Sequence, residues 1–216
     1  MHAWMVSRLK EESLYKYVED FLINQLECFA TFQKIGTVFT GYADVIGIKD
    51  IGGRTSGDFE VIAVEVKKST YRFAANLGQA LGYSLLAHRC YLATHLKESY
   101  TSEQEQMATH LGVGLISIYG KECEEICSSP RHQPIRSLML KTLENADYGI
   151  CNFCGNLVSV KKGWTRNITQ GIEKGYLFYY PKKLSDRRVL FSQQEKPSKW
   201  VYVCGDCIKH LKLTGS

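Results

Sequence analysis

The sequence predicts a mixed α/β domain followed by a small, basic, cysteine-rich module. Helical and β-type hydrophobic patterns alternate over residues 8–119 in the order α-β-β-β-α-β-α-β, which indicates a mixed central sheet flanked by helices. Two Cys-x-x-Cys pairs, Cys151/Cys154 and Cys204/Cys207, lie beyond this region. We therefore place the α/β domain at residues 1–120, a linker at residues 121–137 and the module at residues 138–216.

Local patterns support each element of the domain. A helical stripe is expected within residues 8–27, and β-prone segments follow at residues 29–33, 37–48 and 59–66. The later elements are an apolar helix at 76–88, a strand at 90–94, an amphipathic helix at 101–111 with Gly112 as its C-cap, and a buried strand at 113–119. Acidic residues and prolines after residue 120 are typical of a linker.

The composition excludes several classes of protein. The chain has 216 residues, of which 44% are hydrophobic and 23% charged, as in ordinary globular proteins and unlike disordered or collagen-like chains. No stretch approaches the ~20 apolar residues that cross a bilayer, and no apolar segment precedes the first charged residues. We therefore expect a protein of the cytoplasm, which is a reducing compartment, without a membrane partner.

Acidic residues interrupt two of the expected strands. Asp44 lies within one strand, where aspartate is a poor strand former and is costly to bury alone. Glu65 and Lys67 lie two residues apart at the end of the next strand, so their side chains project from one face, beside Asp44 if the strands pair. Taken singly, these residues are better explained as a turn residue and a surface ion pair. Together they favour a site for Mg²⁺ or Mn²⁺, because converging carboxylates repel each other and need a proton or a divalent cation.

This combination resembles the PD-(D/E)XK nuclease superfamily, whose signature is matched by Asp44 and, after a hairpin-length gap, by Glu65-Val66-Lys67. The segment Gln79-Ala80-Leu81-Gly82-Tyr83 resembles the QxxxY element of its RecB-like and Mrr-like branches. The resemblance covers residues 8–119 and implies a restriction-endonuclease-like core. The residue before Asp44 is Ala43 where the family pattern has proline, which shapes only the backbone.

The resemblance implies a role for each matched residue. Asp44 and Glu65, with the carbonyl of Val66, would hold Mg²⁺ or Mn²⁺. Lys67 would address the nucleophilic water, and Gln79 would orient that water or a phosphate of the scissile strand.

Two further positions are left with alternatives. Tyr83, one helical turn after Gln79, either joins the QxxxY element or simply packs in the core. Many members of the family add a glutamate from the first helix, and both Glu11 and Glu12 compete for this place. We expect Glu11, because it lies on the buried side of the helical stripe, three and seven residues before Leu14 and Val18.

The cysteine pairs predict a structural zinc site. Cys151, Cys154, Cys204 and Cys207 supply the four thiolates that tetrahedral Zn²⁺ prefers, although 49 residues separate Cys154 from Cys204, against about 15–20 in the commonest sites. A redox role would need a βαβ context that is missing. Some RecB-like relatives bind an iron–sulfur cluster through one cysteine before the core and three after it; here all four follow the core, so zinc is favoured.

The charge of the chain is concentrated in the module. The chain carries a net charge of +5; residues 1–150 hold 15 Lys/Arg and 18 Asp/Glu, whereas residues 151–216 hold 12 and 4, a net of +8. A basic module indicates a partner with phosphates, which we expect to be DNA. The candidate DNA-binding residues lie between the cysteine pairs: Lys161, Lys162, Arg166, Lys182, Lys183, Arg187 and Arg188.

These observations lead to one main expectation. The protein would be a Mg²⁺-dependent deoxyribonuclease, an endonuclease that hydrolyses phosphodiester bonds through a metal-activated water while a zinc-stabilised basic domain grips DNA. Two alternatives stay open: a non-cleaving DNA-binding protein on a nuclease fold, and a nuclease acting on RNA or on branched or single-stranded DNA. Nuclease cores that cut both strands often dimerise, so a homodimer is compatible with the resemblance.

Overall fold

The computed structural model describes residues 10–37, 41–52, 58–96, 99–151, 154–159, 178–181, 200–203 and 207. The chain divides into two compact units. Unit 1 comprises residues 1–50 and 59–142, and unit 2 comprises residues 51–58 and 143–216.

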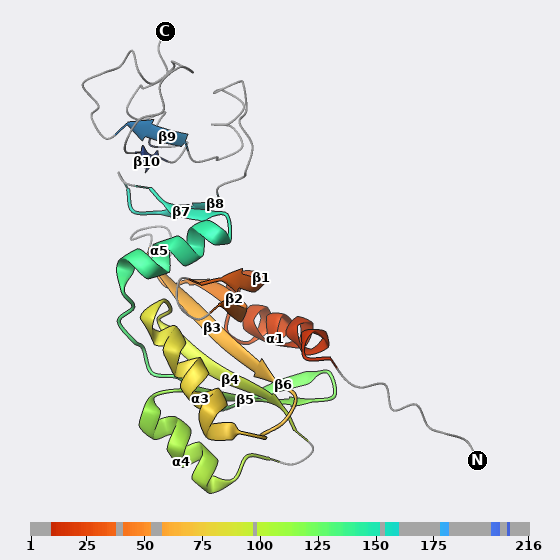
Figure 1. Ribbon diagram of the computed structural model, residues 1–216. Coiled ribbons are helices and arrows are strands. Elements are labelled where there is room, and N and C mark those ends of the chain that lie inside the picture. The colour runs from red at the N-terminus through yellow and green to blue at the C-terminus, as the bar shows by residue number, and fades with distance from the viewer. Residues whose placement is uncertain are drawn as a thin grey trace. The chain divides into compact units, whose positions relative to one another are not determined.

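Unit 1 is a mixed α/β structure built on a six-stranded sheet in the order β1-β2-β3-β4-β5-β6 (Figure 1). Strands β1 to β3 are antiparallel, β3 to β5 are parallel, and β6 is antiparallel to β5. The strands are β1 (Cys28–Gly36), β2 (Tyr42–Asp50), β3 (Phe59–Lys67), β4 (Arg89–His95), β5 (Gly114–Tyr119) and β6 (Glu122–Cys127). The six-stranded mixed sheet flanked by helices confirms the predicted α/β class.

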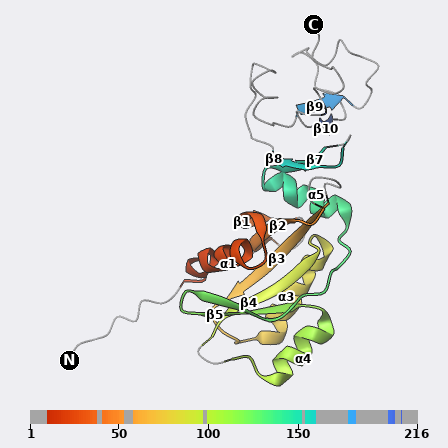
Figure 2. The same cartoon turned by 180° about the vertical axis from the view of Figure 1, so that it is seen from behind.

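Helices cover both faces of this sheet (Figures 1 and 2). Helix α1 (Glu12–Asn24) lies on one face. Helix α3 (Phe73–Gly82), which continues into the 3₁₀ turn η1 (Tyr83–Leu85), connects β3 to β4, and α4 (Ser102–Leu111) connects β4 to β5. These two crossover helices lie on the other face, so strands β3 and β4 are covered on both sides.

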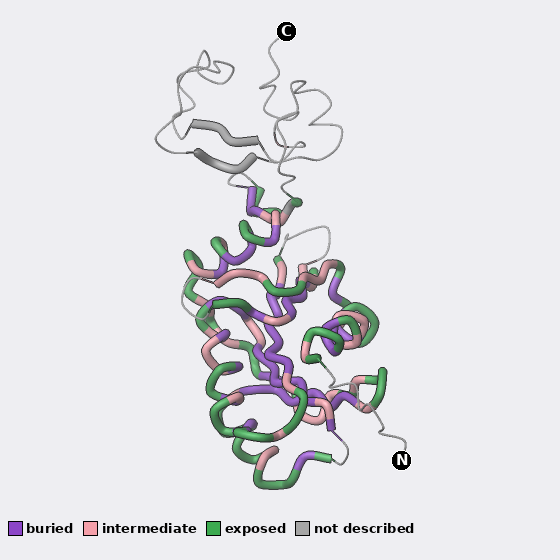
Figure 3. The backbone as a smooth tube through the Cα atoms, turned by 45° about the vertical axis from the view of Figure 1, so that its right-hand side comes forward, coloured by how far each residue is buried: buried purple, intermediate pink, exposed green. Residues whose placement is uncertain are grey.

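The core of unit 1 forms between α1 and the sheet. Buried residues gather on the central strands, as Figure 3 shows, and the apolar stripe of α1 packs on them. The core includes Leu14, Val18 and Leu22 from the helix and Val64 and Ile116 from the sheet. The predicted helical stripe therefore does pack on the strands.

Helix α4 has a clear signal at each end. Thr101 accepts a hydrogen bond from the amide of Gln104, and the Gln104 side chain accepts one from the amide of Thr101, which forms a capping box. The helix ends at Gly112, whose φ of 72° lies in the left-handed region that glycine tolerates best. The predicted C-cap at Gly112 is confirmed.

The segment expected as a linker differs in its structure. Residues 122–127 form strand β6, which extends the sheet beyond β5. The chain after β6 also remains attached to unit 1: the Ser129 hydroxyl accepts from the amide of Cys90 (3.1 Å), and the amide of His132 donates to the carbonyl of His88 (2.7 Å). The acidic residues that had indicated a linker are compatible with a strand at this place. An edge strand pairs with a neighbour on one side only and tolerates charged side chains.

Unit 2 contains two small antiparallel pairs of strands among its described residues. Strands β7 (Tyr148–Ile150) and β8 (Leu157–Ser159) form one pair, and β9 (Phe178–Pro181) and β10 (Trp200–Val203) form the other. Helix α5 (Arg136–Asn145) leads from unit 1 into unit 2. Among the described residues, no helix has the length and apolar character needed to cross a membrane.

Candidate active site and cysteine cluster

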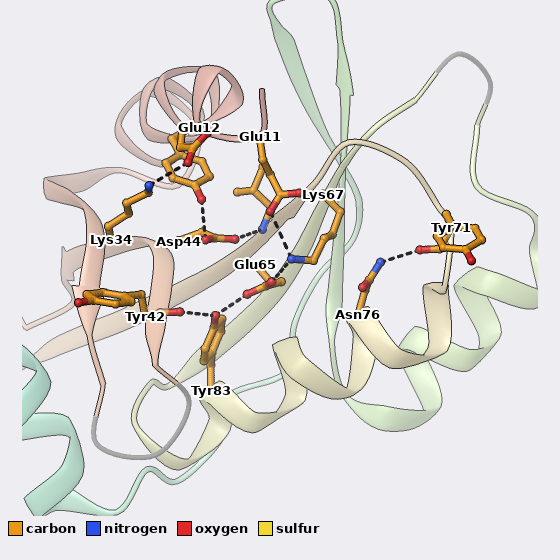
Figure 4. Close-up of polar contacts among 12 residues, drawn as sticks. Glu11, Glu12, Lys34, Tyr42, Asp44, Glu65, Lys67, Tyr71, Asn76 and Tyr83 are labelled. Carbon is orange, nitrogen blue, oxygen red and sulfur yellow. Dashed lines mark hydrogen bonds and ion pairs between the residues drawn. The ribbon is translucent and has the colours of Figure 1, made fainter. Parts of the chain in front are cut away.

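Strands β2 and β3 bring Asp44 and Glu65 face to face. Their register pairs Val45 with Val64, and one further step sets Asp44 opposite Glu65. Opposite residues of an antiparallel pair project from the same face of a sheet, and Figure 4 shows the two side chains close together. The Glu65 side chain is 1% exposed, whereas Asp44 is half-buried. The strand pairing on which the predicted site depended is therefore present.

Hydrogen bonds from the protein orient both carboxylates. The Tyr15 hydroxyl donates to Asp44 Oδ1 (2.7 Å), and the amide of Val66 donates to Asp44 Oδ2 (2.8 Å). The Tyr83 hydroxyl donates to Glu65 Oε2. A carboxylate oxygen that accepts one hydrogen bond keeps a second lone pair, so these contacts leave room for a ligand.

Lys67 bridges two acidic side chains at the same strand end. Its Nζ donates to Glu65 Oε1 and lies 3.4 Å from Glu11 Oε1 (Figure 4). Glu12 points elsewhere and pairs with the exposed Lys34 at 2.9 Å. The structure thus places Glu11, not Glu12, in the cluster, as the helical stripe indicated.

The environment sets the protonation of the cluster. Burial raises the pKa of Glu65, and the charge of Asp44 raises it further, against the hydrogen bonds from Lys67 and Tyr83. Burial lowers the pKa of Lys67, but the hydrogen bond and charge of Glu65 outweigh burial, so the pKa is raised. Burial and a neighbouring carboxylate raise the pKa of both Tyr15 and Tyr83. At neutral pH, Lys67 is therefore an ammonium group and both tyrosines are neutral donors.

The structure shows where Tyr83 and Gln79 lie and adds a third residue, Tyr15, that the sequence did not indicate. Tyr83 is fully buried and also contacts Glu65, so core packing and the site share this residue. Gln79 is exposed on α3, and its side-chain hydrogen bond is among the influences that lower the pKa of Tyr83. Tyr15 was not among the residues that the sequence indicated, although its position four residues after Glu11 places both side chains on one face of α1.

The chemistry of the cluster fits a divalent cation. Lys67 contacts two carboxylates, those of Glu65 and Glu11, and the nearby charge of Asp44 helps to raise the pKa of Glu65. Carboxylate and carbonyl oxygens are the ligands that Mg²⁺ prefers. The Val66 amide faces Asp44, and because the N–H and C=O of one strand residue point to the same side, the Val66 carbonyl also faces β2.

A second candidate site lies in unit 2, where three cysteines converge. The sulfur atoms of Cys151, Cys154 and Cys207 all lie within 4.8 Å of one another. Two backbone hydrogen bonds shape the turn between β7 and β8: the amide of Cys151 donates to the carbonyl of Asn156, and that of Gly155 to the carbonyl of Cys151, both at 2.9 Å. This cluster could bind a metal ion such as zinc.

The remaining predicted residues lie outside the described part of the chain. They are Cys204, the fourth predicted zinc ligand, and the candidate DNA-binding residues Lys161, Lys162, Arg166, Lys182, Lys183, Arg187 and Arg188.

Comparisons with known proteins name no function. No family model matches the chain, and no curated protein matches it. Among solved structures, the chain is similar to the SPO1766 protein of unknown function from Silicibacter pomeroyi, at 16% sequence identity and a TM-score of 0.45. The match covers 64% of this chain and 84% of the other. A likeness at this level supports neither a family nor a function.

Proposed function

We propose that the protein is a metal-dependent deoxyribonuclease, an endonuclease that hydrolyses phosphodiester bonds of DNA. One observation carries the proposal: Asp44 and Glu65 face each other across β2 and β3, with Lys67 held against Glu65 at the same strand end. This arrangement resembles a PD-(D/E)XK site in which Ala43 stands in place of the proline. A restriction-endonuclease-like fold for unit 1 belongs to the proposal and is supported by its mixed sheet with helices on both faces.

Asp44, Glu65 and the Val66 carbonyl would hold Mg²⁺ or Mn²⁺. A bound divalent cation supplies a water of lowered pKa and offsets negative charge on a phosphate. The hydroxyl of Tyr15 and the amide of Val66 fix the orientation of Asp44, and the hydroxyl of Tyr83 fixes Glu65. The protein thus presents oriented oxygen ligands, which reduces the reorganisation needed on binding.

Lys67 acts in this proposal as a fixed positive charge. Its raised pKa keeps it protonated at neutral pH, so it donates hydrogen bonds rather than removing a proton. From its place against Glu65 it can hold the attacking water or stabilise charge that develops on the phosphate. Glu11 keeps the ammonium group at the strand end. Gln79, exposed one turn before Tyr83, can contact the water or the scissile strand.

Unit 2 has a supporting role in the proposal. Cys151, Cys154 and Cys207, with Cys204 as the fourth ligand, would bind a structural zinc ion. The net charge of +8 over residues 151–216 supports contact with DNA phosphates. The Lys and Arg residues between the two cysteine pairs would make these contacts, although they lie outside the described residues.

The test is cleavage of supercoiled plasmid and of circular single-stranded DNA with Mg²⁺ or Mn²⁺. We expect wild-type protein to cut, chelation to abolish cutting, and Glu65→Gln and Lys67→Met each to lower the rate by about 100-fold or more. Glu12→Gln is the matched control, since it alters a neighbouring glutamate that pairs at the surface with Lys34, and it should keep near-wild-type activity. Thermal melting of each variant checks that the fold is retained.

Two results would contradict the proposal. If wild-type protein binds DNA but cuts none with either metal, the protein is a DNA-binding protein on this fold and not an enzyme. If RNA is cut and DNA is not, the assignment of a deoxyribonuclease is wrong.

A further inference from the structure

Two exposed tyrosines lie on opposite sides of the candidate active site. Tyr42 begins β2, two residues before Asp44, and is 65% exposed. Tyr71 follows β3, four residues after Lys67, and is 78% exposed. Figure 4 shows one tyrosine on each side of the cluster formed by Asp44, Glu65 and Lys67. A single exposed aromatic residue is ordinary, whereas two exposed rings that flank one site suggest a ligand that contacts both.

The backbone of Tyr42 is fixed although its ring is exposed. The hydroxyl of Tyr83 contacts the carbonyl oxygen of Tyr42 (3.1 Å) as well as Glu65. A single buried hydroxyl therefore links the backbone that carries the exposed ring to a candidate metal ligand. A polymer that contacts Tyr42 would therefore pass close to Asp44, two residues further along β2.

The backbone of Tyr71 is fixed in the same way by other residues. Its amide donates to Ser69 Oγ (3.4 Å), and its carbonyl accepts from Asn76 Nδ2 (3.0 Å). The next residue, Arg72, adopts a left-handed conformation with φ of 56°, which turns the chain sharply into α3. An exposed ring on a fixed turn can bind a flat ligand without a further loss of backbone freedom.

Positive charge flanks Tyr71. Lys68 and Arg72 lie three residues before it and one after it, and both are exposed. Within the described part of the chain, neither forms an ion pair with an acidic side chain. An exposed ring between cations matches a ligand in which flat apolar groups alternate with negative charges, as bases and phosphates do in nucleic acid.

We propose that Tyr42 and Tyr71 stack bases of single-stranded DNA on either side of the scissile phosphate, with Lys68 and Arg72 binding the adjacent phosphates. The proposal rests on the proposed function of the active site and names its substrate class. In a duplex, neighbouring bases cover each base face, whereas an unpaired strand leaves the faces free to stack on side chains. The two rings are separated by charged groups, unlike the continuous apolar patch of a protein interface.

The experiment measures binding by full-length Glu65→Gln protein, whose cleavage rate should be lower by about 100-fold or more under the proposed function. Its ligands are a fluorescein-labelled single-stranded DNA oligonucleotide, the blunt duplex of the same sequence and the matching single-stranded RNA. Tyr71→Ala and Tyr42→Ala should each weaken single-strand binding by about 5- to 100-fold and duplex binding by less than about twofold. Tyr71→Phe should restore binding, since stacking needs the ring and not the hydroxyl. Lys68→Ala and Arg72→Ala should each lower the salt dependence of single-strand binding.

Matched control variants show whether the loss is specific to the residues beside the active site. Phe29→Ala deletes an exposed ring of β1 at the end of the sheet away from Tyr42, and Lys121→Ala deletes an exposed cation between β5 and β6; both should bind like the parent. A 2-aminopurine base in the oligonucleotide reports stacking directly. Its fluorescence should change on binding to the parent protein and not on binding to Tyr42→Ala/Tyr71→Ala.

The outcomes separate this inference from the proposed function. If wild-type protein cuts DNA but the tyrosine variants keep their single-strand affinity and the 2-aminopurine signal, the inference is overturned and the proposed function stands. If the tyrosine variants lose single-strand affinity but wild-type protein cuts nothing, the proposed function fails and the stacking surface stands. Equal losses on single strand and duplex, or stronger binding of RNA than of DNA, would also overturn the inference.

Discussion

Two carboxylates of the candidate active site, those of Asp44 and Glu65, each accept a hydrogen bond from a tyrosine whose ring is buried in unit 1. Tyr15 reaches Asp44 from α1 on one face of the sheet, and Tyr83 reaches Glu65 from the helix segment on the other. Packing therefore fixes two polar groups that a flexible surface would leave mobile. The two rings contribute to the core and to the site at once, so their hydroxyls can be tested separately from their packing.

Removal of the Tyr15 hydroxyl tests this link. Tyr15→Phe keeps the buried ring and deletes the donor to Asp44 Oδ1. We expect cleavage activity or the affinity for Mg²⁺ to fall by about 10- to 100-fold, the usual loss when a group that orients a metal ligand is removed. Metal titrations of the cleavage rate measure both quantities.

Tyr17→Phe is the control for this change, because Tyr17 lies on the same helix and packs against the same core. It should behave like wild type. A Tyr15→Phe protein with wild-type rate and metal dependence would contradict an orienting role for the hydroxyl.

Part of the site was predictable from sequence because the positions of its residues follow from the period of a single strand or helix. Glu65 and Lys67 share a face whenever their segment is a strand, and Glu11 follows from the helical stripe. Tyr15 was not predictable in this way, since an aromatic residue beside Leu14 in an apolar stripe is ordinary core. Its hydroxyl reaches Asp44 only when α1 packs across the end of β2, which is a tertiary contact.

At the scale of elements, the packing of α1 on the sheet depends on a glycine. A Cβ atom at Gly47 of β2 would lie 2.7 Å from Cys28 Sγ and 3.2 Å from Leu22 Cδ1. Strand β2 carries Asp44, and α1 carries Glu11 and Tyr15. The close approach at Gly47 therefore supports the same elements that build the site.

We expect Gly47→Ala to lower the free energy of unfolding by about 1–3 kcal/mol, because added volume in a packed core forces its neighbours to move. Urea denaturation measures the change. Adding Cys28→Ala should recover part of the loss, since it removes the sulfur that the new methyl group meets. Gly78→Ala is the control: a Cβ atom there meets nothing within 4 Å, and alanine should stabilise α3 by about 0.5–1 kcal/mol. Equal effects at the two glycines would contradict this account of the packing.

The elements were predictable where hydrophobic period and caps agree, as in α4 with its capping box and Gly112. Strand β6 was not, because Glu122, Glu124 and Glu125 obscure its period. One of these acids has a partner that only the fold supplies: Glu125 accepts a hydrogen bond from the Tyr91 hydroxyl (2.7 Å). Tyr91 in turn lies against Gly114, where no Cβ atom fits. Such a contact joins residues 34 positions apart, beyond the reach of a local pattern.

At the scale of the whole molecule, the two units differ in how they gain stability. Unit 1 has a six-stranded sheet and a core of large buried side chains. Among the described residues of unit 2, the strands are three or four residues long, and the cysteine cluster lies beside the turn between β7 and β8. Short strands bury little apolar surface, so we expect a metal ion bound at the cysteine cluster to stabilise the described part of unit 2.

This difference predicts two separable unfolding transitions in calorimetry of the full-length protein. Removal of zinc with a strong chelator, or the substitution Cys151→Ser, should lower the transition temperature of unit 2 and leave that of unit 1 nearly unchanged. Gly47→Ala should lower the transition temperature of unit 1 and leave that of unit 2 nearly unchanged.

Elemental analysis should find about one zinc ion per chain in wild-type protein and much less in Cys151→Ser. Cys28→Ser is the matched control, because Cys28 lies in unit 1 and should leave the zinc content unchanged. A protein that is fully loaded without Cys151, or a single transition that chelation shifts as a whole, would contradict a zinc ion that stabilises unit 2 alone.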